Sequence, residues 1–178
     1  MTIRKFTQVT TKKGDTGTSK NYSNETFRKD DLLFETLGTN DELSSVLGLC
    51  YHHTNHEPIR TIQRTLQDMN AMIATNPNTD RSRYDKLKHL TEADVELLED
   101  EEAALLDKKP IEPHFFLPGS DTSPSGAWYD LARAVARRAE RTLVRFINAH
   151  ERDDLAIPRQ YLNRLSDLLF ILARNADI

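Results

Sequence analysis

Five arginines and one glutamate lie within a helix-patterned segment between residues 127 and 149. Three of these arginines, Arg133, Arg137 and Arg141, are spaced at i, i+4 and i+8, so a helix places their guanidinium groups along one face. An apolar stripe at helical spacing occupies another face of the same segment. Crowded guanidinium groups repel one another unless an anion lies opposite, and they suit phosphates and carboxylates. The pattern therefore predicts a helix that meets a polyanion, with acidic side chains that hold the arginines in place.

The rest of the chain is acidic, so this positive charge is a local feature. The 178 residues carry a formal net charge of −4, and their number suits one domain with a substantial core. The acidic balance argues against a general nucleic-acid-binding protein and favours a small polyphosphate as ligand. The single cysteine, Cys50, excludes an internal disulfide framework. No apolar run approaches the roughly 20 residues that span a bilayer, which predicts a soluble protein.

Apolar periodicity predicts four long helices and a fifth, shorter one, and no strand. The helical stripes run from residue 30 to about 52, from 58 to about 75, from 91 to about 107 and from 127 to 149, and the last begins at Pro158. Residues 1–29 are predicted to form a flexible N-terminal loop, and four prolines predict a second loop over residues 108–126. Short connections between long helices are typical of a bundle.

Two segments contain residues that helix packing does not require. Residues 11–19 combine two glycines with lysines and hydroxyls, a composition that suits phosphate oxygens, although a solvated terminal loop explains it equally well. Residues 38–43 place glycine, threonine, asparagine and aspartate inside a helical pattern, where they are poor helix formers. Either the helix breaks there, or Asp41 faces the arginine-bearing helix and orients one of its guanidinium groups.

A third segment, residues 161–167, brings polar groups to the last helix. Asn163 and Asp167 are four residues apart and therefore share a helix face. Asn163 can bind an adenine or ribose edge, or it can bind a neighbouring helix. Arginines together with Glu140 and Asp167 are equally typical of a structural ion-pair network.

Taken together, these segments resemble the ATP:cob(I)alamin adenosyltransferases of the trimeric, propanediol-utilisation type. The resemblance runs from Thr11 to about Ala173 and rests on seven motifs in order. They are Thr-Lys-x-Gly-Asp-x-Gly at 11–17, Lys-Asp-Asp at 29–31, Gly-Thr-x-Asp-Glu-Leu-Ser-Ser at 38–45, Leu-Gln-Asp at 66–68, Phe-x-Leu-Pro-Gly at 115–119, Arg-Ala-Val-x-Arg-Arg-Ala-Glu-Arg at 133–141 and Tyr-Leu-Asn-Arg-Leu-Ser-Asp at 161–167.

The resemblance implies an all-α fold: a five-helix bundle in a ferritin-like up-down arrangement, one domain over residues 1–178, assembled as a homotrimer with interfacial sites. It implies transfer of the 5′-deoxyadenosyl group of ATP to cob(I)alamin, which forms adenosylcobalamin and releases triphosphate. Mg²⁺ is expected mainly on the ATP phosphates. A cob(II)alamin reductase and an adenosylcobalamin-dependent enzyme are expected partners. Binding to nucleic acid or to a membrane is not expected. The expected compartment is the mitochondrial matrix for a eukaryotic protein and the cytoplasm otherwise.

The resemblance also assigns residues to the ATP site. Arg137 matches an arginine that contacts the triphosphate with Mg²⁺, and Glu140 and Asn163 match two further ATP-site positions. The N-terminal loop matches a segment that wraps ATP, and its residues in that role are Thr11, Lys12, Gly14, Asp15, Gly17 and Thr18, with Lys29 nearby.

Three residues are assigned to catalysis together with Arg137. Arg133 matches an arginine that pairs with an aspartate, here Asp41, and so braces the nucleotide and corrinoid sites together. Phe115 matches a phenylalanine that lies below the corrin ring, excludes the lower nitrogen ligand and leaves four-coordinate cobalt.

The chain departs from the family pattern mainly on the corrinoid side. The stretch over residues 119–130 is about two residues longer than usual, and Asp130 stands where family members often carry histidine. The arginine common before Lys-Asp-Asp is shifted or replaced. The ATP side therefore matches the family better than the loop over residues 108–126 does, which we call the corrinoid-side loop.

Two other functions fit parts of the sequence. One is a non-catalytic nucleotide- or corrinoid-binding trimer that acts as a sensor or cofactor chaperone. The other is a helical interaction protein whose arginine-bearing helix binds an acidic helix, such as its own residues 92–107. The intact set of Asp41, Arg133, Arg137 and Asn163 favours the enzyme.

Overall fold

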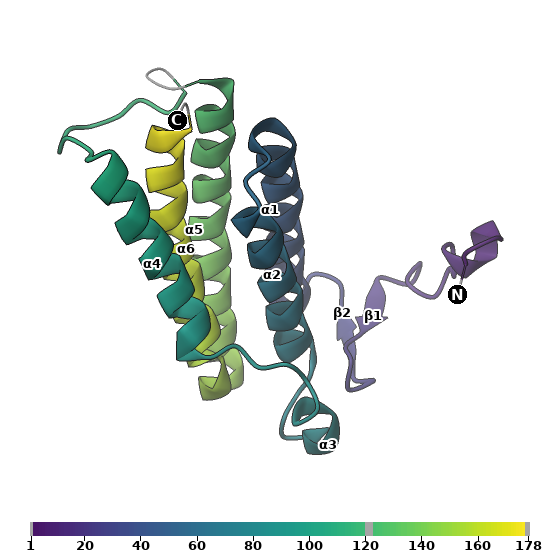
Figure 1. Ribbon diagram of the computed structural model, residues 1–178. Coiled ribbons are helices and arrows are strands. Elements are labelled where there is room, and N and C mark those ends of the chain that lie inside the picture. The colour runs from purple at the N-terminus through teal and green to yellow at the C-terminus, as the bar shows by residue number, and fades with distance from the viewer. Residues whose placement is uncertain (1, 120–122, 177–178) are drawn as a thin grey trace.

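The computed structural model describes residues 2–119 and 123–176, and five long helices form most of this part of the chain (Figure 1). They are α1 (Leu32–Thr54), α2 (Pro58–Ala74), α4 (Glu92–Lys108), α5 (Pro124–His150) and α6 (Ala156–Asn175). All five of these helices are long, whereas the sequence predicted four long helices and one short one. Shorter elements are α3 (Arg81–Tyr84) and the 3-10 turns η1 (Phe6–Gln8) and η2 (Asp153–Leu155).

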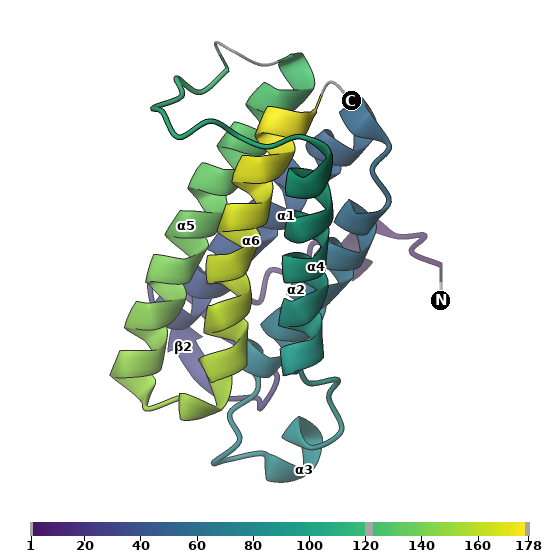
Figure 2. The same ribbon diagram turned by 60° about the vertical axis from the view of Figure 1, so that its left-hand side comes forward.

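The long helices pack in the order α2, α1, α5, α6, α4. Helix α5 packs on both α1 and α6, α2 covers α1, and α4 lies along α6. Figure 2 shows α5, α6 and α4 side by side with α1 and α2 behind them. Because α5 sits in the middle of this order, its arginine-bearing face is positioned by two neighbours.

A small hairpin precedes the bundle, and the prediction of a chain without strands was wrong here. Strands β1 (Thr18–Lys20) and β2 (Thr26–Arg28) are antiparallel, with Ser19 opposite Phe27. Strands of three residues are too short to show a periodic pattern. Contacts with distant residues hold the hairpin, since the Tyr22 amide donates a 2.8 Å hydrogen bond to the carbonyl of Ala74.

The ends of the helices follow local signals that the sequence shows. Thr91 and Asp94 form the predicted capping box of α4. Helix α5 begins three residues earlier than predicted, at Pro124, because proline is tolerated in the first turn and the Ser123 side chain accepts a hydrogen bond from the Gly126 amide.

Helix α1 continues through residues 38–43, so the helix break considered from the sequence does not occur. The Thr39 hydroxyl donates a 2.7 Å hydrogen bond to the Glu35 carbonyl within the helix. Asn40 is fully buried, and its amide donates a 2.9 Å hydrogen bond to the Asn70 side chain on α2. Tertiary partners therefore compensate for the weak helix propensity of these residues.

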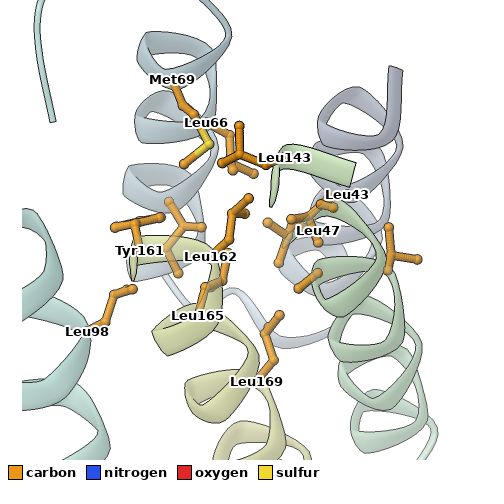
Figure 3. Packing of buried hydrophobic residues seen from close by; sticks show 14 of the residues in the cluster. Leu43, Leu47, Leu66, Met69, Leu98, Leu143, Tyr161, Leu162, Leu165 and Leu169 are labelled. Carbon is orange, nitrogen blue, oxygen red and sulfur yellow. The ribbon is translucent and has the colours of Figure 1, made fainter. Parts of the chain in front are cut away.

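The core lies where α1, α2, α5 and α6 meet. Figure 3 shows leucines of α1, α5 and α6 pointing toward one another, with Leu66 and Met69 of α2 above them. Leu43, Leu162 and Leu165 are fully buried. Burial of a leucine side chain stabilises a fold by about 1.5–3 kcal/mol, so this cluster fixes how α5 and α6 lie beside each other.

We predict that Leu162→Ala lowers the free energy of unfolding by about 2–5 kcal/mol, because it leaves a cavity at the centre of this cluster. Urea unfolding followed by circular dichroism at one protein concentration measures the loss. Leu97→Ala is the matched control, because Leu97 is 62% exposed, and it should change stability by less than about 0.5 kcal/mol. Equal losses in both variants would contradict the position given to the core.

Candidate active site

The N-terminal segment forms a tight, glycine-dependent turn beside the hairpin. Gly17 has a φ of 78°, in the left-handed region, and its carbonyl accepts a 2.9 Å hydrogen bond from the Lys29 amide. A side chain at Gly14 would place its Cβ 2.7 Å from Lys29 Nζ. The two glycines thus let the Lys29 ammonium approach the backbone of the turn.

This turn lines a hollow of about 410 Å³ whose walls are hydroxyls and lysines. Of the predicted ATP-binding residues, the structure brings Thr11, Gly14 and Thr18 to its lining. Lys12 and Asp15 are exposed outside that lining. A hollow with ammonium groups and hydroxyls suits an anion such as a phosphate.

The other predicted ATP-site residues share the exposed face formed by α5 and α6. Asn163 Nδ2 on α6 donates a 3.1 Å hydrogen bond to Glu140 Oε1 on α5. One helical turn away, Arg137 is exposed. Among the described residues its guanidinium has no ion-pair partner, although Arg141 donates a hydrogen bond to its carbonyl. We call Arg133, Arg137, Glu140 and Asn163 the α5–α6 face.

Arg133 lies at one end of this face and helps to line a second hollow. Its guanidinium carbon is 5.7 Å from the centre of the Phe170 ring, a cation–π contact. Arg133, Asp167 and Phe170 line this hollow of about 440 Å³ together with residues of the segment that follows α4. Arg133 is thus the member of the α5–α6 face that lies nearest the corrinoid-side loop, since both line this hollow.

Asp41 faces α2 within one chain, not the arginine-bearing helix. Its carboxylate accepts a 3.1 Å hydrogen bond from Asn70 Nδ2. The next residue, Glu42, pairs with Arg138 of α5 instead. Successive helix residues point about 100° apart, so only one of the two acids can face α5. Among the described residues no ion pair joins Asp41 to Arg133 within one chain, and the expected pair stays a prediction.

The corrinoid-side loop presents Phe115 to solvent. Its side chain is 85% exposed, whereas the neighbouring Phe116 is half-buried against Phe170, with ring centres 5.9 Å apart. A bare phenylalanine ring is typical of a surface that binds an apolar ligand or partner. Of the altered stretch over residues 119–130, residues 120–122 lie outside the described residues.

Sequence reasoning missed two features near this site, a buried ion pair and a half-buried acid. Arg174 and Asp130 form an ion pair with side chains 5% and 8% exposed. Asp130 had been noted only as a departure, and the partner could not be found because it lies 44 residues away. The second group is Glu102 on α4. An acid within an acidic helix carries no signal that distinguishes it from its exposed neighbours.

Glu102 belongs to a group of three carboxylates around a single arginine. Arg164 Nε lies 2.6 Å from Glu99 Oε1, and Arg164 Nη1 lies 3.6 Å from Asp167 Oδ2. Burial raises the pKa of Glu102 to about 7, and the Asp167 carboxylate adds to the shift, which Arg164 opposes. The side chain thus changes charge near neutral pH, and Asp167, whose charge acts on it, lines the same hollow as Arg133.

The two halves of the predicted ATP site lie on different sides of a single chain. In Figure 1 the N-terminal segment and hairpin stand beside α1 and α2, and α4 and α6 lie on the other side of the bundle. A helical bundle with a phosphate-suited turn and a separate arginine-rich face indicates a nucleotide-binding protein.

Comparison with known proteins identifies the family. The profile of the family described as cobalamin adenosyltransferase matches residues 9–176, and the chain belongs to this family. The bovine corrinoid adenosyltransferase MMAB is 37% identical over 178 residues, which cover 96% of this chain and 71% of the relative. A corrinoid adenosyltransferase of Citrobacter freundii is 33% identical over 172 residues, 94% of this chain and 93% of the relative.

A solved structure supports the fold. A variant of the PduO-type ATP:corrinoid adenosyltransferase from Lactobacillus reuteri, complexed with cobalamin and ATP, superposes with a TM-score of 0.85. The sequences are 27% identical, and the match covers 95% of this chain and 93% of that one. The resemblance drawn from the seven motifs is thereby confirmed.

The described residues contain neither a membrane-spanning helix nor a cluster of metal-binding side chains. Within residues 2–119 and 123–176, no helix combines the length and apolarity needed to cross a membrane. In the same part of the chain, no three His, Cys, Asp or Glu side chains are grouped so that they could hold a metal ion.

We predict that Glu102→Gln becomes increasingly stabilising, relative to the unchanged protein, as the pH rises from about 5 to 8. A carboxyl with a raised pKa keeps its proton in the folded chain after the unfolded chain has lost it, so the folded state loses stability as the pH rises from 4.5 to about 7. Since the group is partly exposed, we expect about 1 kcal/mol.

Urea unfolding of both proteins at pH 5 and pH 8 measures this difference. Glu96→Gln is the control, because Glu96 is exposed on the same helix. A stability difference between Glu102→Gln and the unchanged protein that does not depend on pH would show that Glu102 titrates normally.

Proposed function

We propose that the chain binds ATP between two subunits of a homotrimer, with the N-terminal turn of one subunit facing the α5–α6 face of the next. The chain is an ATP:corrinoid adenosyltransferase that forms adenosylcobalamin, as its family membership over residues 9–176 establishes. The shared site is supported by one observation: both halves are built within each chain, but they lie on different sides of it.

The reaction requires the protein to position its substrates and does not require it to supply a nucleophile. Co(I) of the corrinoid substrate attacks C5′ of ATP, the cobalt–carbon bond forms, and the C5′–oxygen bond breaks as triphosphate leaves with its electron pair. No side chain needs to act as nucleophile. The protein must hold C5′ in line with cobalt and stabilise the charge that collects on the leaving triphosphate.

The cations of both half-sites suit this task. Arg137 is exposed and unpaired among the described residues, whereas Arg138 beside it is neutralised by Glu42. Lys12 and Lys29 supply positive charge from the N-terminal turn, whose amides can also approach phosphate oxygens. Because Asn163 holds Glu140 by a hydrogen bond, that carboxylate is oriented beside the arginine that binds triphosphate.

Mg²⁺ fits the proposed site as a companion of the phosphates. It usually keeps several waters and binds through substrate phosphates with only one or two carboxylates. Glu140 is the carboxylate of the α5–α6 face and would supply that contact. When bound, Mg²⁺ would neutralise part of the triphosphate charge.

Phe115 is proposed to form the apolar wall below the corrin ring. An apolar ring cannot donate electrons to cobalt, and its bulk displaces the lower nitrogen ligand. Loss of that ligand makes cob(II)alamin easier to reduce to the nucleophilic cob(I)alamin. The 85% exposure of Phe115 supports this role, because most of the ring surface is open to contact with a ligand.

The cellular setting is part of the same proposal. The cob(I)alamin substrate requires a cob(II)alamin reductase, and the product serves an adenosylcobalamin-dependent enzyme. We place the protein in the mitochondrial matrix if its source is eukaryotic and in the cytoplasm otherwise.

An anaerobic assay with ATP, Mg²⁺ and chemically reduced cob(I)alamin tests the reaction. Adenosylcobalamin should form together with an equal amount of triphosphate, both measured directly. Tight binding of ATP or cobalamin without product would favour the non-catalytic sensor or chaperone. Light scattering should give a mass three times that of the 20.4 kDa chain.

We predict that Lys12→Ala and Arg137→Ala each lower kcat/KM by at least about 100-fold, and that mixed trimers of the two variants recover activity. Each variant removes one half of every site, whereas mixing them creates some sites with both halves intact. The measurement is turnover after the two proteins are unfolded and refolded together.

Arg138→Ala is the matched control, since it removes an adjacent arginine that pairs with Glu42 and should change turnover by only a few-fold. A mixture that stays as inactive as its components would show that both halves act within one chain.

We predict that Phe115→Ala slows the reaction that starts from cob(II)alamin with a reductant far more than the reaction that starts from cob(I)alamin. The wall is needed only for the reduction, because cob(I)alamin already lacks its lower ligand. Parallel rate measurements from the two starting states test this. An equal loss from both would argue that Phe115 acts in the transfer step or in binding.

A further inference from the structure

A buried ion pair lies beside the corrinoid-side loop, and neither proposed substrate site uses it. Asp130, near the start of α5, pairs with Arg174, near the end of α6, and both side chains are more than nine-tenths buried. Removing two charges from water costs more than their attraction returns in many proteins, so a buried pair is weak evidence for stability. Its other contacts therefore indicate what it does.

Those contacts reach the segment 109–119 at both of its ends. At the start, Lys109 Nζ donates a 2.9 Å hydrogen bond to the carbonyl of Arg174. At the end, the amide of Gly119 donates a 3.1 Å hydrogen bond to Asp130 Oδ2. Gly119 has a φ of 74°, a conformation that glycine adopts without strain, so the turn suits this contact.

The middle of the segment is held by an aromatic contact with the same arginine. The guanidinium carbon of Arg174 lies 4.8 Å from the centre of the Phe116 ring. The adjoining Phe115 side chain is exposed and makes no such contact within the described part of the chain, so the placement of its ring depends on how Phe116 and Gly119 are held.

The pair also connects the segment to the nucleotide side. The guanidinium carbon of Arg174 lies 5.5 Å from the centre of the Phe170 ring, and that of Arg133 lies 5.7 Å from the same centre. One ring thus separates the cation that holds the loop from the first arginine of the α5–α6 face. The position of the loop is set relative to the face that is proposed to hold ATP.

We propose that Asp130 and Arg174 are positioning residues for the corrinoid half of the reaction: they hold residues 109–119 so that Phe115 lies below the corrin ring. This inference rests on the proposed wall role of Phe115. It gives Asp130 a positioning function, because its carboxylate accepts from both the loop and the buried guanidinium.

The main test replaces both charges by apolar side chains of similar length, Asp130→Leu with Arg174→Met. Such a replacement of a buried pair is commonly tolerated, so the double variant should fold, whereas Asp130→Asn alone leaves a buried unpaired cation. The double variant removes the acceptor for the Gly119 amide and the cation above Phe116.

Hydrogen exchange of the double variant measures the loop directly. Amides of residues 109–119 should exchange at least tenfold faster than in the unchanged protein, whereas amides of α2 should keep their rates. Unchanged exchange over 109–119 would overturn the inference, because the pair would then not hold the segment.

Kinetics and electron paramagnetic resonance test the consequence for the substrate. The KM for cobalamin should rise about tenfold, the KM for ATP should stay within twofold, and the fraction of four-coordinate cob(II)alamin should fall. Asp85→Asn is the control, because it removes the exposed pair of Asp85 with Arg81 and should change none of these. Equal rises in both KM values would point to a general structural defect and overturn the inference.

Phe115→Ala, measured in parallel, separates this inference from the wall role itself. If Phe115→Ala lowers the four-coordinate fraction and the double variant does not, the positioning role fails alone. If Phe115→Ala leaves that fraction unchanged, the wall role fails, and with it the functional part of the inference.

Discussion

Helix α5 must bury one face in the bundle while it keeps unpaired cations on another, and much of the structure follows from this requirement. Its buried positions are rich in alanine, among them Ala132, Ala136 and Ala139, which let α1 and α6 approach closely. Arg138 is neutralised by Glu42, but Arg137 is left unpaired among the described residues. Packing must therefore exceed the repulsion between neighbouring guanidinium groups, and a bound triphosphate would relieve that repulsion.

The helices could be predicted from the sequence because their signals are local. Apolar spacing, the capping pair of Thr91 and Asp94 and the proline turns all lie within a few residues of the structure they determine. The same holds for the α5–α6 face, since the spacing of Arg133, Arg137 and Glu140 already places them on one side of a helix.

Features that depend on distant residues could not be predicted in this way. The hairpin is tied to the end of α2, and Asp41 turns toward Asn70 because α5 packs on the side of α1 that carries Glu42. The partner of Asp130 lies in the last turns of α6. Periodicity reports which residues share a face of one helix, but it does not report which neighbour that face meets.

The division of the proposed nucleotide site between two sides of the chain links ligand binding to assembly. A ligand that contacts two subunits at once binds the assembled form more tightly than the separate chains, and it must therefore stabilise the assembly by the same free energy. At low protein concentration, the cellular level of ATP would then determine how much of the protein is assembled. A chain arranged in this way is sensitive to nucleotide supply through its quaternary structure, without any separate regulatory site.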